Sequence, residues 1–114
     1  MPVYRLQFAR KVTDINGLES CEMFGARDGH ADLGIAWWML PPGVSASGRP
    51  EPRTRALIIL NGRARASIEG RAEDMSAGHA AYIPAGTTWE LANTGREPVV
   101  CYAIAVPADP AGDA

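Results

Sequence analysis

Apolar and polar residues alternate with a period of two along most of the chain, which is the pattern of β-strands covered on one face. Nine prolines and twelve glycines divide the sequence into pieces too short for ordinary helices. The sequence therefore predicts an all-β domain. Met75–Ala81 also fits a short helix, but Gly78 inside it disfavours that interpretation.

The most distinct predicted element is a hairpin. Ala56–Leu60 forms its first strand, Asn61-Gly62 its type I′ turn and Arg63–Glu69 its second strand, because Asn-Gly accepts the positive φ angles of that turn. The second strand alternates polar residues with alanine and isoleucine, so one of its faces meets water. The first strand is apolar on both faces, which indicates burial between two layers or against a partner chain.

Further strands are predicted between clusters of turn-forming residues. They are Val3–Val12, Ile35–Leu40, Ala80–Ile83, Trp89–Asn93 and Val99–Val106. About eight short strands in a chain of this size form a sandwich, a jelly roll or a barrel. We therefore expect one β-barrel domain over residues 1–106, followed by a flexible tail over Pro107–Ala114.

Charge and hydropathy exclude several classes of partner. The formal net charge is −2 and acidic and basic residues are interspersed. The sequence therefore lacks the run of basic residues with which a protein follows a nucleic-acid backbone. No apolar run approaches the roughly 20 residues that span a bilayer. Charged residues between Arg5 and Asp14 interrupt the apolar stretch that a signal peptide needs. We expect a cytoplasmic protein without a nucleic-acid or membrane partner.

Cys21 and Cys101 are the only cysteines, and neither has a second Cys or a His at metal-ligand spacing. Isolated cysteines of this kind are typical of buried thiols. A disulfide between the two and a nucleophilic thiol remain as alternatives.

Residues 78–93 resemble the second motif of the cupin superfamily. In that motif a glycine is followed after five residues by Pro-x-Gly, after two more by a histidine and after three more by an asparagine. Gly78, Pro84, Gly86 and Asn93 stand at these positions, but Trp89 replaces the histidine.

The same alignment brings residues 42–62 onto the first cupin motif, whose metal ligands are His-x-His and a Glu or Gln four residues later. Arg49, Glu51 and Arg55 stand at these three positions. The resemblance covers roughly residues 35–106. It implies a single-domain, RmlC-like jelly-roll barrel, a double-stranded β-helix with an open mouth and an interior pocket. It also implies a homodimer in which an N-terminal strand such as Val3–Val12 joins the neighbour's sheet.

The residues at the ligand positions do not suit a metal ion. Arginine stays protonated and the tryptophan N–H only donates, so Glu51 alone offers a lone pair. We expect neither a metal nor another cofactor. His79 is expected to cap a turn or face solvent. His30 lies in a polar loop between Asp28 and Asp32, expected to be solvated or to pack over the pocket mouth.

Side chains two residues apart on a strand share a face, so Arg49, Glu51 and Arg55 are expected to point into the barrel. One carboxylate pairs with one guanidinium, which leaves positive charge for an anionic ligand. The alternative is that residues 45–55 form a rim loop whose charges lie in water, in a purely structural sandwich.

We expect the apolar residues at the other inward-facing strand positions to form the wall of the pocket. One of Trp37 and Trp38 faces inward, either as core or to stack on a ligand, and Cys101 either lines the pocket or packs between the sheets. The outward indole favours a dimer interface that covers it. The predicted ligand-binding residues are Arg49, Arg55, Trp37, Trp89, Leu57, Leu91 and Cys101.

Together these features predict a small metal-independent cupin that binds a small anionic or aromatic ligand. One interpretation is a non-redox isomerase, cyclase or lyase of secondary metabolism, with Glu51 as general acid–base and an arginine stabilising negative charge. A second is a non-catalytic binding or sensing module. A third is a metal-dependent dioxygenase or isomerase with a ligand set rebuilt from Glu51, His30 and His79.

Overall fold

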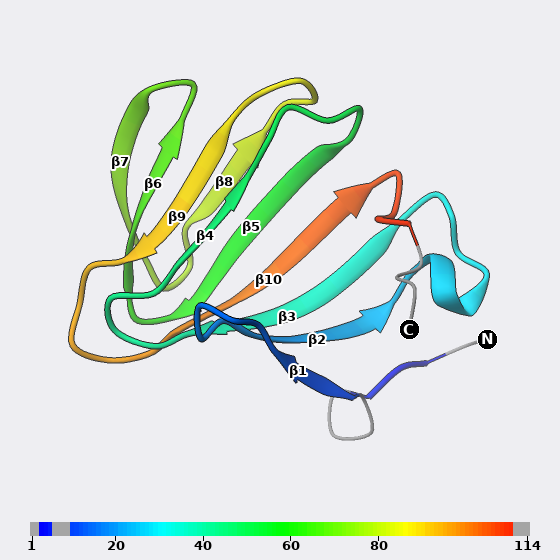
Figure 1. Ribbon diagram of the computed structural model, residues 1–114, viewed down its shortest axis with the longest axis horizontal. Coiled ribbons are helices and arrows are strands. Elements are labelled where there is room, and N and C mark those ends of the chain that lie inside the picture. The colour runs from blue at the N-terminus through cyan, green and yellow to red at the C-terminus, as the bar shows by residue number, and fades with distance from the viewer. Residues whose placement is uncertain (1–2, 6–9, 111–114) are drawn as a thin grey trace.

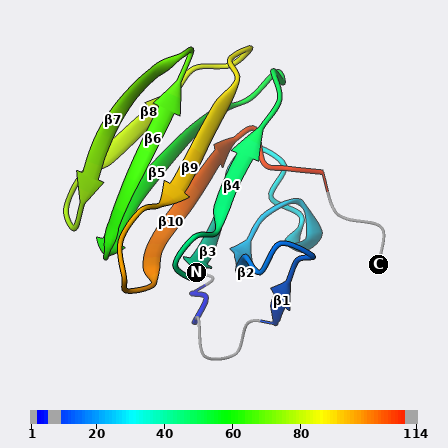
Figure 2. The same cartoon turned by 60° about the vertical axis from the view of Figure 1, so that its left-hand side comes forward.

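The computed structural model describes residues 3–5 and 10–110, and within them two antiparallel β-sheets stack face to face (Figures 1 and 2). A single turn of 3₁₀ helix, Ala26–Asp28, interrupts the strands. In this part of the chain no helix has the length and hydropathy needed to cross a membrane.

The larger sheet has six strands in the order β1-β2-β3-β10-β5-β8. They are β1 (Lys11–Thr13), β2 (Glu19–Phe24), β3 (Gly34–Leu40), β10 (Val99–Val106), β5 (Thr54–Asn61) and β8 (Ala80–Ile83). The last strand, β10, lies between β3 and β5 and pairs with both along almost its whole length. It therefore joins the early and middle parts of the chain into one sheet.

The smaller sheet has four strands in the order β4-β9-β6-β7. They are β4 (Ser45–Gly48), β9 (Trp89–Asn93), β6 (Arg63–Ile68) and β7 (Arg71–Ser76). Alternation along β6 is clear, since its alanines are buried and its arginines exposed. The inner faces of the two sheets enclose the core, in which Leu40, Ile59 and Leu91 are fully buried.

The predicted hairpin at Asn61-Gly62 is wrong, although both of its strands exist. The chain crosses at Gly62 from the large sheet to the small one, so β5 and β6 do not pair. Gly62 has φ +90°, and a Cβ there would lie 2.5 Å from the carbonyl oxygen of Pro98. The tight hairpin turn is instead Glu69-Gly70, with positive φ at both residues, between the paired strands β6 and β7.

Met75–Ala81 is not a helix, in agreement with the interpretation that Gly78 disfavours one: β7 continues to Ser76, and a turn containing Gly78 at φ +88° leads into β8. Two further expectations about elements are corrected. The predicted strand Val3–Val12 is present only from Lys11, because Val3–Arg5 and Arg10 are not strand and residues 6–9 lie outside the described residues. The strands β2, β4 and β7 were not expected.

Residues just beyond β10, expected as the start of a flexible tail, lie against the domain. Ala108 is buried, and its backbone N–H donates to the carbonyl of Ala31 at 3.1 Å. Arg53 donates from Nη1 to the carbonyl oxygens of Pro107, at 3.3 Å, and Ala108, at 2.7 Å. This segment, residues 107–109, is called the C-terminal strap below.

Candidate functional site

A cavity of about 530 Å³ opens at the mouth of the barrel, where the two motif regions meet. The turn between β1 and β2, the end of β4 with the residues after it, and the C-terminal strap form its rim. Trp38, Glu51, Arg55 and Trp89 line its interior side. The structure therefore brings together Glu51 and Arg55 from the first motif region and Trp89 from the second.

Glu51 and Arg55 form the polar centre of this cavity. Oε1 of Glu51 accepts hydrogen bonds from Nε and Nη2 of Arg55 at 3.1 and 2.7 Å, and Oε2 accepts from Nε of Arg53 at 3.0 Å. Nη1 and Nη2 of Arg55 also donate to the two carboxylate oxygens of Asp109, at 3.0 and 2.6 Å. Two arginines and two carboxylates thus close into one network.

The electrostatics of Arg55 follow from this network. Burial disfavours its charged form, but the hydrogen bonds and charges of Asp109 and Glu51 outweigh that effect and raise the pKa of Arg55 above its usual value. Arg55 is thus a permanent cation inside the mouth, with a side chain only 10% exposed.

Two indoles form the apolar wall. The ring of Trp89, from β9, stacks on that of Trp38, from β3, and so bridges the two sheets. Trp89 is nearly fully buried, whereas Trp38 is half-buried and lines the cavity. Of the two adjacent tryptophans on β3, Trp38 is therefore the inward one.

The structure corrects the prediction for Trp37, which does not line the cavity. Side chains alternate along β3, so the Trp37 ring lies on the outer face of the large sheet, where the Lys11 ammonium sits 5.3 Å from its centroid. Arg49 lines the cavity, but it is exposed at the rim, as in the rim-loop alternative, and does not lie inside the barrel. The strand β4 ends at Gly48 and Pro50 follows, so strand alternation no longer relates Arg49 to Glu51.

Leu57, Leu91 and Cys101 face inward as predicted, but they belong to the packed core and not to the cavity. Burial raises the pKa of the Cys101 thiol to about 12. Cys21 is also buried, and both cysteines are free thiols, as the sequence predicted.

The histidines lie away from the mouth. Nδ1 of His79 accepts from the backbone N–H of Ser76 at 3.0 Å, which confirms its turn-capping role. Nε2 of His30 lies 2.8 Å from the hydroxyl of Tyr4, and its ring packs edge-on against Tyr4 and Phe24. A metal site built from Glu51, His30 and His79 is therefore wrong. Within the described residues no group of three His, Cys, Asp or Glu side chains could hold a metal ion.

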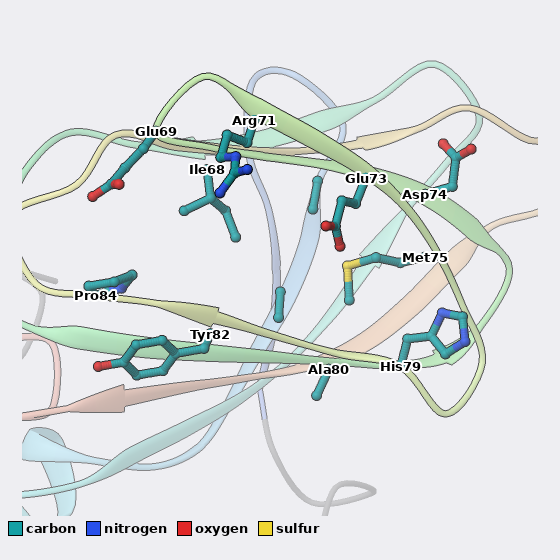
Figure 3. A pocket seen from close by; sticks show the side chains of 12 residues that line it. Ile68, Glu69, Arg71, Glu73, Asp74, Met75, His79, Ala80, Tyr82 and Pro84 are labelled. Carbon is teal, nitrogen blue, oxygen red and sulfur yellow. The ribbon is translucent and has the colours of Figure 1, made fainter.

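A larger cavity, of about 620 Å³, lies between β7 and β8, the outermost strands of the two sheets (Figure 3). Arg71, Glu73 and Met75 project into it from β7. Of the predicted site residues only His79, from the metal-dependent interpretation, lines it, and its charged side chains are exposed to solvent. The barrel mouth, with its partly buried charges and stacked indoles, is the better candidate site.

Comparisons with known proteins agree on the fold. A family model described as "Cupin domain" matches residues 36–105. No curated protein matches the sequence. A predicted oxalate decarboxylase from Thermotoga maritima superposes with a TM-score of 0.81 at 20% identity, covering 93% of this chain and 99% of that one.

Two further solved structures are similar. KdgF from Halomonas sp. gives a TM-score of 0.82 at 14% identity, covering 95% of this chain and 96% of that one. A Cupin 2 conserved barrel domain protein from Salinispora arenicola gives 0.76 at 24% identity, covering 93% and 88%. At such identities the likeness concerns the fold alone, and it confirms the predicted jelly-roll barrel.

Proposed function

Since the chain belongs to the cupin domain family, by its match over residues 36–105, we propose that it binds a small organic molecule at the barrel mouth without a metal ion. The observation that carries this proposal is the pairing of a stacked-indole wall with a partly buried cation in one cavity of about 530 Å³. Ligand pockets typically combine an apolar wall with a few fixed polar groups.

The donor set does not fit the metal that cupins commonly hold. Of the four ligand positions, Arg49 and Arg55 are cationic, and the Trp89 indole has no lone pair to give. Glu51 could supply a ligand atom, but its two oxygens already accept three hydrogen bonds from arginines. No step of the proposed function therefore runs through a metal.

The cavity favours a ligand with a flat apolar part and a negative charge. The half-buried face of Trp38 offers stacking area. Arg49 lies exposed at the rim and makes no ion pair with any described residue, so its guanidinium is open to an anion entering the mouth.

Binding is tested with protein purified without an affinity tag. Native mass spectrometry should find a retained small molecule, or titration with aromatic acids should change the fluorescence of the protein. Trp38→Ala should weaken binding at least tenfold, while Trp37→Ala, its neighbour on the opposite face of β3, should leave binding within about twofold. Equal losses in both variants, or stoichiometric bound metal, would contradict the proposal.

Catalysis by Glu51 is the second candidate function. Oε2 of Glu51 accepts one hydrogen bond, and the side chain is 32% exposed at the cavity, so one lone pair remains open to a substrate proton. The chemistry would be non-redox isomerisation, cyclisation or elimination. Glu51→Gln should abolish turnover, whereas the weaker pairing with Arg53 and Arg55 should lower ligand affinity and the unfolding midpoint only in part. Retained turnover in that variant would exclude Glu51 as the acid–base group.

The protein is further proposed to act as a cytoplasmic homodimer. Trp37, Tyr102 and Ile58 stand side by side in register on the outer face of the large sheet, and Tyr82 nearby is 67% exposed. A continuous apolar face of this kind is typical of a subunit interface. Sedimentation equilibrium should give a dimer for the native chain and a monomer for Tyr102→Glu; a native monomer would contradict it.

A further inference from the structure

At the barrel mouth, the side chain of Arg55 is already paired with a carboxylate of the chain itself, that of Asp109. Both oxygens of Asp109 accept hydrogen bonds from the two terminal nitrogens of Arg55, at 3.0 and 2.6 Å. This is the parallel, two-bond geometry in which a guanidinium recognises a carboxylate. The Asp109 side chain is 52% exposed, whereas that of Arg55 is 10% exposed, so the cation is fixed and the carboxylate comes to it from solvent.

We propose that Asp109 stands in for the ligand, and that the ligand of the site is a carboxylate that displaces Asp109 from Arg55. This inference rests on the proposed function, because it names the chemical class of the ligand for the same cavity. The incoming carboxylate takes the two terminal nitrogens of Arg55, and its flat apolar part lies against Trp38.

Arg55 can make this exchange without losing its place. Its Nε and Nη2 stay bonded to Glu51, so the terminal edge is left for one carboxylate. That edge offers two parallel N–H groups, which a carboxylate satisfies together. A neutral amide has only one oxygen to accept with, and its NH₂ group would face another donor. The site should therefore discriminate strongly between an acid and its amide.

Asp109 can leave while the rest of the strap stays. The backbone of the strap is held independently, by Arg53 on the carbonyls of Pro107 and Ala108 and by Ala108 on Ala31. Nε of Arg53 also lies 3.5 Å from Oδ1 of Asp109, which gives the displaced side chain a nearby cation. Displacement thus needs a side-chain rotation and no unfolding.

The strap also limits affinity. A tethered carboxylate competes with the ligand, so the apparent dissociation constant rises by the inverse of the fraction of molecules in which Arg55 is free. Removing the competing charge should tighten binding of acids and leave neutral ligands unchanged. This sets the exchange apart from a purely structural ion pair, whose loss would not favour acids.

Benzoate and benzamide are the probes, because they share a ring and differ in the group that meets Arg55. Titration calorimetry would compare the native chain with Asp109→Asn and with the control Asp74→Asn. The control removes an aspartate whose 2.8 Å ion pair with Arg65 is exposed and distant from the mouth. Asp109→Asn should bind benzoate at least fivefold more tightly, and benzamide unchanged; the control should alter neither.

Two further measurements keep the outcomes separate. Arg55→Lys retains the charge and loses the two-bond edge, so benzoate should lose most of its advantage over benzamide. In two-dimensional nitrogen–proton NMR spectra of the native chain, benzoate should shift the backbone amide signal of Asp109. This measurement does not depend on the folding of any variant. Equal binding of acid and amide, or no gain in Asp109→Asn, would overturn this inference alone. Failure of both probes and of a wider set of aromatic and aliphatic compounds would overturn the proposed function itself.

Discussion

The indole of Trp89 stacks on that of Trp38 with ring centroids 6.0 Å apart and planes inclined by 14°. The two rings come from different sheets, β9 and β3, so the stack joins the layers at the mouth of the barrel. Trp89 stands where cupins have a metal-binding histidine, and a large apolar ring there provides packing in place of a coordination bond. The barrel is held at this point by burial and aromatic contact.

Truncation of Trp89 should therefore destabilise the fold. Trp89→Ala removes a nearly fully buried indole that spans the sheets, and we expect the free energy of unfolding to fall by about 3–5 kcal/mol. Urea denaturation followed by circular dichroism measures it. Glu90→Ala, the adjacent exposed residue on β9, should stay within about 0.5 kcal/mol of the native chain. A loss below about 1 kcal/mol for Trp89→Ala would show that the stack is not structural.

Gly48 should be needed to admit the Trp89 ring. A Cβ at position 48 would overlap Nε1 of Trp89, so Gly48→Ala should cost about 1–3 kcal/mol of unfolding free energy. Ser47→Ala, on the exposed face of β4, should be nearly neutral. The added Cβ would clash only with the Trp89 side chain. The loss of unfolding free energy in the double variant Gly48→Ala/Trp89→Leu should therefore be smaller than the sum of the losses in the two single variants. Strict additivity would locate the strain elsewhere.

Most strands could be predicted because one of their faces is buried, so that apolar residues recur at every second position, as in β6 and β10. The pairing of strands could not be predicted in the same way. Asn61-Gly62 is a favourable hairpin turn, yet the chain uses the freedom of Gly62 to change sheets, a choice made by the packing of distant strands. The exposed positions of β7 gave no alternation to detect.

The alignment with the two cupin motifs placed Glu51, Arg55 and Trp89 at one cavity, where the structure also has them, while their roles there stay predictions. Strand alternation did not place the side chains where the chain leaves the sheet. Arg49 lies beyond the end of β4, so the two-residue period no longer placed its side chain. Asp109 gave no local signal either, since its position depends on a long-range contact with Arg55.

The partly buried ion network at the mouth should contribute more than an exposed ion pair. Arg55→Met removes the guanidinium that Glu51 and Asp109 share and leaves them with Arg53 alone, so we expect a loss of about 2 kcal/mol in the free energy of unfolding. Arg65→Met removes the exposed pair with Asp74 and should cost at most about 0.5 kcal/mol. Chemical denaturation of both variants in the same buffer gives the comparison. Similar losses for the two would contradict a structural role for the mouth network.

Cys101 should make the stability of the fold fall at alkaline pH. Its pKa is raised from 9.0 to about 12 by burial, so the folded state keeps the thiol proton that the unfolded chain releases. The stabilisation is therefore fully present below pH 9 and is lost as the pH rises from about 9 towards 12, at about 1.4 kcal/mol per pH unit. Burial raises the pKa of Cys21 as well, so its effect has the same sign.

The contribution of Cys101 can be isolated by comparison with Cys101→Ala. That variant should be less stable at pH 8, but its unfolding free energy should fall less steeply between pH 9 and 10.5, by up to about 1.4 kcal/mol per unit. Comparing slopes removes the titration of lysine and tyrosine, which the two proteins share. In the native chain a thiol reagent should label Cys101 only as fast as the protein unfolds. Parallel pH profiles, or rapid labelling of the folded chain, would show that the thiol between the sheets is open to solvent.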